Sequence, residues 1–238
     1  MQRAEFLRGV TGLQRLVRAE RRHAMSHAKQ VRLGGSVLDR SRHVCAFFHR
    51  KEEEYRVLLP FIKEGFDQGD RAFHMVDPRH RAEHLRRLQE AGIPVAEAER
   101  KGQLEVRRWE DAYLCDGHFD QKRMLALLEE VLAGGTAQGF PFTRLMANME
   151  WALEDRPGVE DLLEYETRVN YLLPKYHDVI CCTYDLARFG ANVVMNILRT
   201  HPMVIIGGIL QENPFFVPPD EFLRELRERA GQNSTGVG

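Results

Sequence analysis

The sequence predicts an α/β domain built on a mostly parallel sheet with helices on both faces. Two observations carry this prediction. Several short runs, such as His43–Phe48 and Met203–Gly208, are almost continuously apolar, which is typical of strands buried on both faces. Segments with the 3.6-residue apolar period of a helix separate these runs. The chain has 238 residues, which is enough for one such domain with appendages.

The first strand and the helix after it form the clearest unit. His43–Phe48 is followed by an amphipathic segment with five apolar side chains on one helical face: Tyr55, Leu58, Leu59, Ile62 and Phe66. Ligands of open α/β sheets collect at the carboxyl ends of the strands, so the turn at residues 49–54 is expected to border a site. This turn has no glycine and contains three consecutive glutamates. It therefore lacks the glycine-rich loop whose backbone amides cradle a phosphate.

The remaining elements alternate along the chain. We predict further strands at residues 71–77, 104–109, 143–149, 178–185 and 203–208. We predict helices at residues 79–91, 120–134, 159–173 and 193–199, each with its apolar side chains on one face. The predicted domain covers residues 36–219. A basic arm, helical or disordered, precedes it at residues 1–35, and a C-terminal helix with a disordered tail follows at residues 220–238.

Composition and charge narrow the range of functions. No run approaches the roughly 18 apolar residues that span a bilayer, and the N-terminus lacks a signal-peptide core, so we expect a cytoplasmic protein without membrane contact. Residues 1–32 contain eight Lys or Arg and two Glu, a net charge of +6, which leaves −7 on the rest of a chain whose net charge is −1. The acidic body argues against nucleic-acid binding except through the arm. The arm could instead be a dimerising helix or a loosely attached segment.

Candidate binding residues come from the strand ends and the first strand, where aromatic, acidic and histidine side chains suit a small, partly apolar molecule. The predicted ligand-binding residues are His43, Cys45, His49, Glu53, Asp77, Trp151, Tyr184 and Asp185. Structural roles compete for three of them: a hydrogen-bonding role for His43, the core for Trp151, and a turn cap for Asp185. His74 is expected to be a satisfied core histidine, and His201 to cap a helix end.

Catalytic and metal motifs are missing from the sequence. No nucleophile elbow, CxxC, HExxH or GxGxxG occurs, so we predict no catalytic residue, no cofactor and no metal ligand. The four cysteines have no framework spacing and are expected to be reduced thiols. One alternative stays open, because His43 and Cys45 share a face of their strand and could bind a soft metal if Cys181 or Cys182 came near.

Several motifs, in their order along the chain, resemble the MEDS domain, the sensory domain of the dichloromethane-responsive regulator of methylotrophs. They are HVCAFF at 43–48, EEE at 52–54, LPFIKEG at 59–65, MEWAL at 149–153, LEYE at 163–166, and the pairs Tyr184-Asp185, His201-Pro202 and Asn213-Pro214. The resemblance covers residues 41–219. It implies a three-layer, RecA/KaiC-like ATPase fold that has lost its phosphate loop and senses small molecules, proposed to be hydrocarbon derivatives.

The resemblance also implies a strand order and a mode of action. In a RecA-like sheet the strand at 178–185 lies beside the first strand, which would bring Cys182 near Cys45. Residues 143–150 replace the strand that would hold a magnesium-binding Asp, and Asn148 stands where family members carry an acid. The DNA-binding or kinase module usually fused to this domain is not recognisable in the sequence. We therefore expect signalling through a partner protein, with a homodimer as a further possibility.

Three functions follow from these observations. The leading hypothesis is a non-enzymatic regulatory domain that senses a small apolar or methylated metabolite. The first alternative is a residual RecA-like nucleotide-binding protein or ATPase, for which Arg50-Lys51 would have to hold the phosphates without glycines. The second alternative is a metal or redox sensor that uses His43, Cys45 and Cys182.

Overall fold

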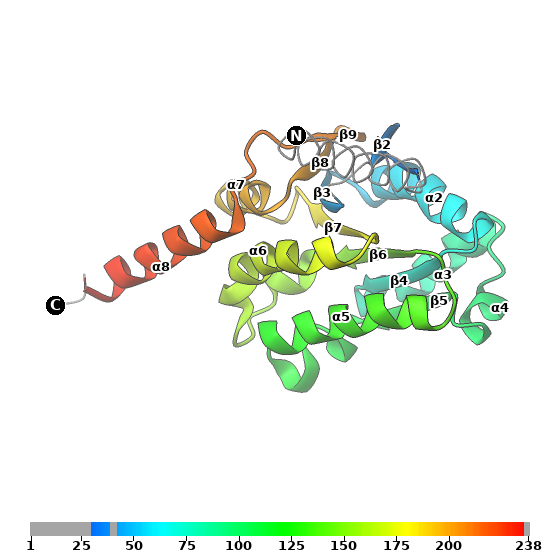
Figure 1. The fold of residues 1–238 in the computed structure, drawn as a ribbon, viewed down its shortest axis with the longest axis horizontal. Helices are drawn as coiled ribbons and strands as arrows, with labels where there is room; N and C mark the ends of the chain where they lie inside the picture. Colours follow the sequence, from blue (N-terminus) through cyan, green and yellow to red (C-terminus); the bar gives the residue numbers. More distant parts are fainter. Residues whose placement is uncertain (1–29, 39–41, 236–238) are drawn as a thin grey trace, which may run out of the picture. The chain divides into compact units, whose positions relative to one another are not determined.

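A seven-stranded sheet forms the centre of the computed structural model, which describes residues 30–38 and 42–235 (Figure 1). Its strand order is β5-β4-β6-β7-β3-β8-β9, and all pairs are parallel except the antiparallel pair β8–β9. The strands are β3 (His43–Phe48), β4 (Arg71–Val76), β5 (Leu104–Arg108), β6 (Thr143–Asn148), β7 (Val179–Asp185), β8 (Met203–Ile206) and β9 (Ile209–Glu212). The predicted mostly parallel α/β class is confirmed.

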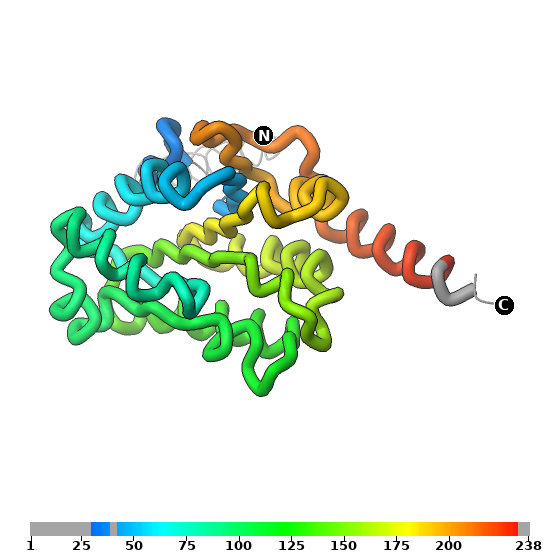
Figure 2. The backbone as a smooth tube through the Cα atoms, turned by 180° about the vertical axis from the view of Figure 1, so that it is seen from behind, coloured from blue at the N-terminus to red at the C-terminus, as the bar shows by residue number. Residues whose placement is uncertain are grey.

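Helices cover both faces of this sheet. One face carries α5 (Gln121–Ala137), α6 (Leu162–Leu172) and α7 (Ala191–Thr200), whose apolar residues pack with those of the strands. The other face, seen from behind in Figure 2, carries α2 (Lys51–Asp67), α3 (Arg81–Glu90) and α4 (Val95–Arg100). The C-terminal helix α8 (Pro219–Thr235) packs against α6 and α7. Short 3-10 helices occupy Pro78–His80, Trp109–Asp111, Cys115–Gly117, Met149–Leu153, Val159–Asp161 and Leu173–Lys175.

The neighbour of the first strand is the one that a RecA-like order requires. β3 pairs in parallel with β7, and Cys45 lies opposite Cys182 in this register. Because side chains alternate along a strand, His43, Cys45 and Phe47 share a face with Cys182 and its neighbours two positions away. That face is the one covered by α6 and α7. The predicted approach of Cys182 to Cys45 is confirmed.

Two predicted boundaries were wrong for local reasons. The predicted strand at 203–208 ends at Ile206, and β9, absent from the prediction, returns antiparallel to it. Gly207 and Gly208 have φ angles of 60° and 80°, which make the tight turn that a two-residue hairpin needs. The predicted helix at 79–91 begins as a 3-10 turn at Pro78, where the Asp77 carboxylate accepts from the Arg79 amide at 2.8 Å, and α3 starts at Arg81.

The start of the folded body also differs from the prediction. Val31–Leu33 (β1) and Ser36–Leu38 (β2) form a small hairpin, although residues 31–35 were assigned to the arm. The hairpin is tied to β9, because the Leu210 amide donates to the Gly34 carbonyl at 3.1 Å. The helical pattern predicted within residues 1–29 lies outside the described residues. Among the described helices, none is long and apolar enough to cross a membrane.

Candidate functional site

The eight predicted ligand-binding residues lie in three separate places. His49, Asp77 and Asp185 lie at or just after the carboxyl ends of strands, and Glu53 lies in the first turn of α2. His43, Cys45 and Tyr184 lie inside the molecule, on the face of the sheet covered by α6 and α7. Trp151 lies in an aromatic cluster beside that face. The predicted residues therefore do not form one site.

Trp151 lies in the hydrophobic core. Its side chain is fully buried and stacks on Tyr113 with the ring centroids 4.5 Å apart and an interplanar angle of 13°. Phe119 contacts it from a further side, at a centroid distance of 4.5 Å. Such contacts fill the space around the indole ring with protein. The burial of Trp151 agrees with the competing core interpretation, and its ligand-binding role stays a prediction.

Three of the predicted residues at the strand ends make local contacts. The Glu53 carboxylate accepts from the backbone amide of His49 at 3.0 Å, which closes the turn before α2. The Asp185 carboxylate accepts from the Ala187 amide at 2.8 Å, which is the turn-capping role considered for it. Asp77 is bound by the Arg79 side chain. Burial raises the pKa of Asp77, but the hydrogen bonds from Arg79 outweigh this effect, and the net shift is downward.

The position of the phosphate loop is occupied by an ion-pair network. Lys51, the first residue of α2, donates to Glu150 at 3.1 Å and to Glu54 at 3.0 Å. Glu150 is 2% exposed and also binds Arg188 and the Asn148 amide nitrogen. Burial raises the pKa of Glu150, but these cationic and amide donors outweigh it and hold the pKa below its ordinary value. At the carboxyl edge of the sheet, the Glu150 carboxylate thus lies between the cations of Lys51 and Arg188.

A small pocket lies beside this network, between the sheet and the helices α2 and α3. Its volume is about 50 Å³, and most of its wall is apolar. It is lined by Lys51, Glu54, Tyr55, His74, Met75, Val76, Asp77, His80, Glu83, His84, Met146, Asn148 and Thr183. Of the predicted ligand-binding residues, only Asp77 lines it. The volume corresponds to a few water-sized groups, so the pocket fits a molecule of a few heavy atoms.

Two buried polar atoms of this pocket have no partner within the described part of the chain: Nε2 of His74 and Oδ1 of Asn148. The other nitrogen of His74 lies 2.8 Å from Nε2 of His84, whose Nδ1 lies 2.9 Å from the Tyr55 hydroxyl. Burial lowers the pKa of both histidines, to about 4 for His84, so the rings are neutral near pH 7. The expectation that His74 is fully satisfied was wrong.

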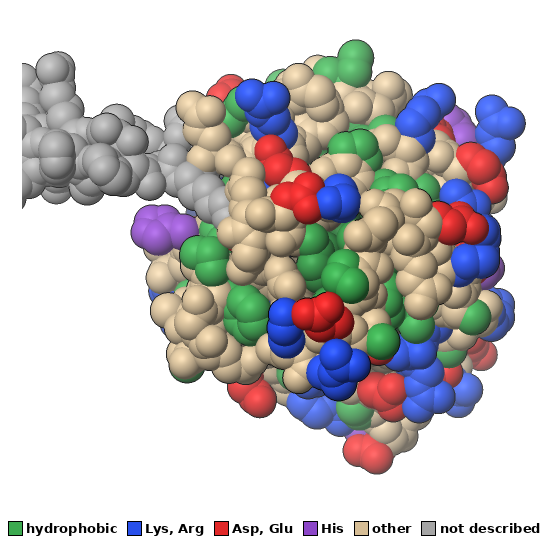
Figure 3. Space-filling model, turned by 90° about the vertical axis from the view of Figure 1, so that its right-hand side faces the viewer, with side chains coloured by type: hydrophobic (Ala, Val, Ile, Leu, Met, Phe, Trp, Pro, Cys, Tyr) green, Lys and Arg blue, Asp and Glu red, His purple; other side chains and the backbone are tan. Residues whose placement is uncertain are grey.

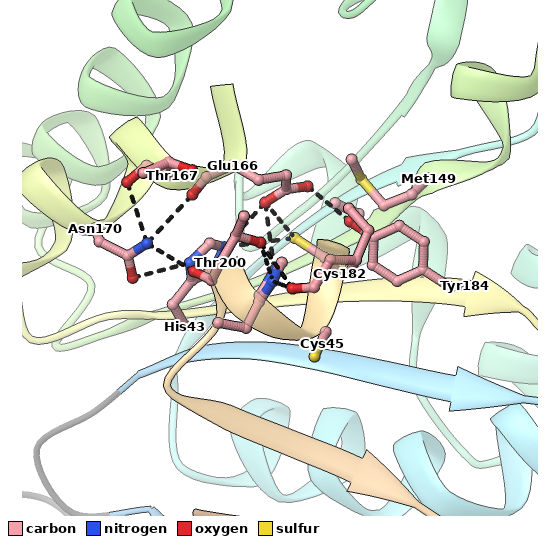
Figure 4. A network of polar contacts seen from close by, with 12 residues as sticks. His43, Cys45, Met149, Glu166, Thr167, Asn170, Cys182, Tyr184 and Thr200 are labelled. Atoms are coloured by element: carbon pink, nitrogen blue, oxygen red, sulfur yellow. Dashed lines mark hydrogen bonds and ion pairs between the residues drawn. The ribbon is translucent and has the colours of Figure 1, made fainter. Parts of the chain in front are cut away.

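A second polar cluster is buried on the opposite face of the sheet (Figure 4). It consists of His43 at the start of β3, Glu166 on α6, Cys182 on β7 and His201 directly after α7. Nε2 of His43 lies 3.2 Å and Nε2 of His201 lies 3.3 Å from the same oxygen of Glu166. Tyr184 donates to the other oxygen of Glu166 at 2.9 Å. Burial lowers the pKa of His43 to about 4.

Comparison with known families identifies the family to which this chain belongs. Residues 42–202 match the model of the family described as MEDS, the MEthanogen/methylotroph, DcmR Sensory domain. The chain belongs to the MEDS family. A curated relative is the transcriptional repressor DcmR of Methylorubrum extorquens (strain DSM 6343 / CIP 106787 / DM4), which is 27% identical over 187 residues. That match covers 77% of this chain and 66% of the repressor, so about a third of the repressor has no counterpart in the match.

Two of the solved structures similar to this MEDS chain come from the archaeon Pyrococcus horikoshii. An uncharacterized protein, solved in complex with an unknown peptide, shares 14% identity at a TM-score of 0.53, over 71% of this chain and 78% of that chain. A KaiC-like protein from strain OT3 shares 16% identity at a TM-score of 0.49, over 72% and 73% of the two chains. The first likeness supports the fold alone. It agrees with the predicted α/β class, a mostly parallel sheet covered by helices.

The sequence did not indicate that Glu166 and His201 would meet in a buried cluster, although a signal existed for Glu166. Glu166 lies on the buried face of α6, between the positions of Leu162, Tyr165 and Val169, so a carboxylate interrupts an otherwise apolar stripe. His201 was expected to cap a helix, and its Nδ1 does lie 3.0 Å from the Ile197 carbonyl. Nothing in the local sequence indicated that its other nitrogen would meet Glu166.

The surface of the MEDS chain near α2, α3 and α4 shows charges of both signs. In Figure 3, Lys and Arg side chains alternate with Asp and Glu side chains on this face, and hydrophobic side chains appear between them. Intrahelical ion pairs such as Glu83 with Arg86 account for part of this mixture. Nucleic acids are bound by surfaces on which positive charge is concentrated. This face has no such concentration among the described residues.

Proposed function

We propose that this chain is a non-enzymatic sensory domain that binds a small, mostly apolar metabolite in the pocket beneath α2 and α3. Binding would be reported to a partner protein that controls transcription or another signalling output in the cytoplasm. The proposal extends the family assignment, because a sensory-domain family and a repressor relative connect the chain with regulation. The ligand and the partner are the parts that need experiment.

The observation that carries the proposal is the pair of unpartnered polar atoms in an apolar pocket. Burying a polar atom without a hydrogen bond costs on the order of 1–3 kcal/mol, so proteins retain such atoms where a ligand or water completes them. Asn148 lines the pocket and donates its amide nitrogen to Glu150, which leaves its Oδ1 as an acceptor without a partner among the described residues. His74 offers a ring nitrogen. Apolar walls with one or two fixed polar groups are typical of sites for small organic molecules.

The phosphate-loop position supports a role without nucleotide chemistry. A triphosphate would need the backbone amides at the start of α2, but the Glu53 carboxylate already accepts from the amide of His49. It would also need Lys51, which is held between Glu54 and Glu150. The first turn of α2 carries three glutamates, and their charge repels phosphate. These contacts favour sensing over ATP hydrolysis.

Ligand binding can be tested by thermal unfolding and calorimetry with a panel of small apolar and methylated metabolites. At least one compound of a few heavy atoms is expected to raise the unfolding midpoint, because a ligand that binds only the folded state stabilises it. The substitution Asn148→Leu removes the free acceptor and is expected to abolish the shift. Asn192→Leu, at an exposed asparagine on α7, is a matched control and is expected to keep it.

Two results would overturn the proposal. The first is a panel without any shift, combined with no partner protein copurifying from the native host. The second is magnesium-dependent ATP turnover that is lost in Lys51→Ala, because this outcome would establish the residual ATPase instead.

A further inference from the structure

Four different ligand atoms converge on one point in the buried cluster of His43, Glu166, Cys182 and His201. All four atoms lie within 4.8 Å of one another, and all four residues are buried. They come from four elements: β3, α6, β7 and the end of α7. Figure 4 shows the side chains of His43, Glu166 and Cys182 pointing toward one another. This convergence is independent of the pocket proposed above, which lies on the other face of the sheet.

The hydrogen bonds around His43 determine which of its nitrogens carries a proton. The amide nitrogen of Asn170 donates to three carbonyl oxygens, those of Glu166, Thr167 and Thr200, at 3.3, 3.1 and 2.8 Å. The amide oxygen of Asn170 therefore faces Nδ1 of His43, at 3.2 Å. Because an amide oxygen only accepts, Nδ1 of His43 must donate. In the neutral ring, Nε2 is then an acceptor, and it points at a carboxylate oxygen of Glu166.

The same reasoning applies to His201. Its Nδ1 lies 3.0 Å from the Ile197 carbonyl and 2.8 Å from the Thr200 hydroxyl. That hydroxyl donates to the Ile197 carbonyl at 2.8 Å, so both neighbours of Nδ1 act as acceptors. Nδ1 of His201 must therefore donate, and Nε2 is left as an acceptor. Nε2 of His201 is fully buried and has no hydrogen-bond partner among the described residues.

Two imidazole nitrogens and one carboxylate oxygen, all acceptors in these tautomers, thus meet, and the only donor among the four groups at this point is the weak S–H of Cys182, which faces Glu166 at 3.7 Å. Lone pairs at 3.2 and 3.3 Å repel one another unless a positive charge lies between them. The Cys182 sulfur completes the group, at 3.7 Å from the same Glu166 oxygen and 3.8 Å from Nε2 of His43. We propose that His43, Glu166, Cys182 and His201 form a binding site for one divalent transition-metal ion of the zinc type.

The separations match a tetrahedral centre. Zinc lies about 2.0–2.2 Å from nitrogen and oxygen ligands and about 2.3 Å from sulfur. A tetrahedron with these bonds separates two nitrogen or oxygen ligands by roughly 3.3 Å, and sulfur from either by about 3.6 Å. Four separations within the cluster, 3.2, 3.3, 3.7 and 3.8 Å, lie close to these values. The ligand set of two imidazoles, one thiolate and one carboxylate also favours zinc over magnesium or calcium, which prefer oxygen ligands alone.

The surrounding contacts are those of a metal site. Each metal-bound histidine in proteins usually donates its other ring N–H to an oxygen, as His43 does to Asn170 and His201 to Ile197. Tyr184 donates to the second oxygen of Glu166, which orients the carboxylate. Four protein ligands without an open position are typical of a structural site. The ion would therefore tie α6 and α7 to the first strand of the sheet.

The test measures metal content and cobalt binding in the purified full chain. Protein prepared without chelator from zinc-supplemented cells is expected to contain about one zinc per chain. After removal of the zinc, added Co²⁺ is expected to give the visible ligand-field bands of four-coordinate cobalt and a thiolate-to-cobalt charge-transfer band. These two measurements use the unmodified chain, so they do not depend on whether a variant folds.

Cysteine variants provide the matched control. Cys181 and Cys182 are neighbours on β7, both are buried, and their side chains point to opposite faces. Cys182→Ser is expected to lose the charge-transfer band and to bind zinc more than about 100-fold more weakly, since even the partners of metal ligands contribute roughly 10–100-fold. Cys181→Ser is expected to retain the charge-transfer band and the zinc affinity of the unmodified chain. The proposal is overturned if the folded unmodified chain holds no zinc and gives no cobalt spectrum, or if both variants bind zinc equally well. Either failure leaves the pocket hypothesis unaffected.

Discussion

Removal of the buried Arg144 guanidinium is expected to destabilise the domain strongly. Arg144 on β6 donates to Asp70 at 2.9 Å, to the Phe61 carbonyl at 2.6 Å and to Glu64 at 3.1 Å. Both Arg144 and Asp70 are 1% exposed, so the pair is shielded from water. The guanidinium thus links the sheet to the C-terminal half of α2. Arg144→Met keeps much of the side-chain volume and removes every donor.

The expected loss in free energy of unfolding follows from the buried Asp70 carboxylate that Arg144→Met leaves without its partner. Breaking a buried ion pair by removing one partner costs about 3–5 kcal/mol, because the remaining charge is uncompensated. A domain is stabilised by roughly 5–15 kcal/mol in total, so Arg144→Met is expected to remove a large share. In the double variant Arg144→Met with Asp70→Asn, the fully buried charge of Asp70 is also removed, and the carboxylate that still loses Arg144 is that of Glu64, which is 26% exposed. The double variant is therefore expected to regain more than half of the free energy of unfolding that Arg144→Met alone loses.

Urea unfolding followed by circular dichroism measures both values by linear extrapolation. Lys63→Met is the control, because Lys63 pairs with Asp67 at the surface, where an ion pair contributes about 0–1 kcal/mol. A loss below about 1 kcal/mol for Arg144→Met would refute the reasoning. So would a double variant as unstable as the single one, since the cost would then not come from the charge of Asp70.

Three further predictions concern single residues. His84 has a pKa of about 4 in the folded protein, below the unfolded value of about 6.5, so its stabilising contribution is complete above about pH 6.5 and is lost as the pH falls toward 4. Between about pH 7 and pH 5 the unmodified chain should therefore lose about 2 kcal/mol more than His84→Gln in urea titrations, and equal losses would contradict this. Gly158→Ala should lower the free energy of unfolding by at least about 1–2 kcal/mol in the same assay, because the φ angle of Gly158 is 85° and an added Cβ would lie 2.1 Å from the Phe119 carbonyl oxygen. An unchanged unfolding midpoint would argue against this backbone geometry. Tyr184→Phe should lower the free energy of unfolding by about 1.5–3 kcal/mol, since the hydroxyl donates to the buried Glu166 carboxylate, whereas a neutral result would mean that water replaces the hydroxyl.

The course of the chain could be predicted from local patterns. Short apolar-rich runs that alternate with helical segments identified six of the seven strands of the main sheet. The missing glycines in the turn at 49–54 indicated that no phosphate loop follows β3. The strand β9 was missed because its residues, Ile209–Glu212, alternate too briefly to stand out. The helix α4 was missed for a similar reason, since six residues give less than two helical turns.

The buried chemistry was decided by tertiary structure. The sequence by itself determined the α/β class and, through the resemblance, the pairing that places Cys45 beside Cys182. It could not determine that Glu166 and His201 would meet His43, because these residues lie more than 30 positions apart and belong to different elements. Periodicity specifies the face of a helix or strand on which a side chain lies, but not which side chains of other elements it contacts. Those contacts depend on how α6 and α7 pack on the sheet, and this packing is set by many apolar contacts at once.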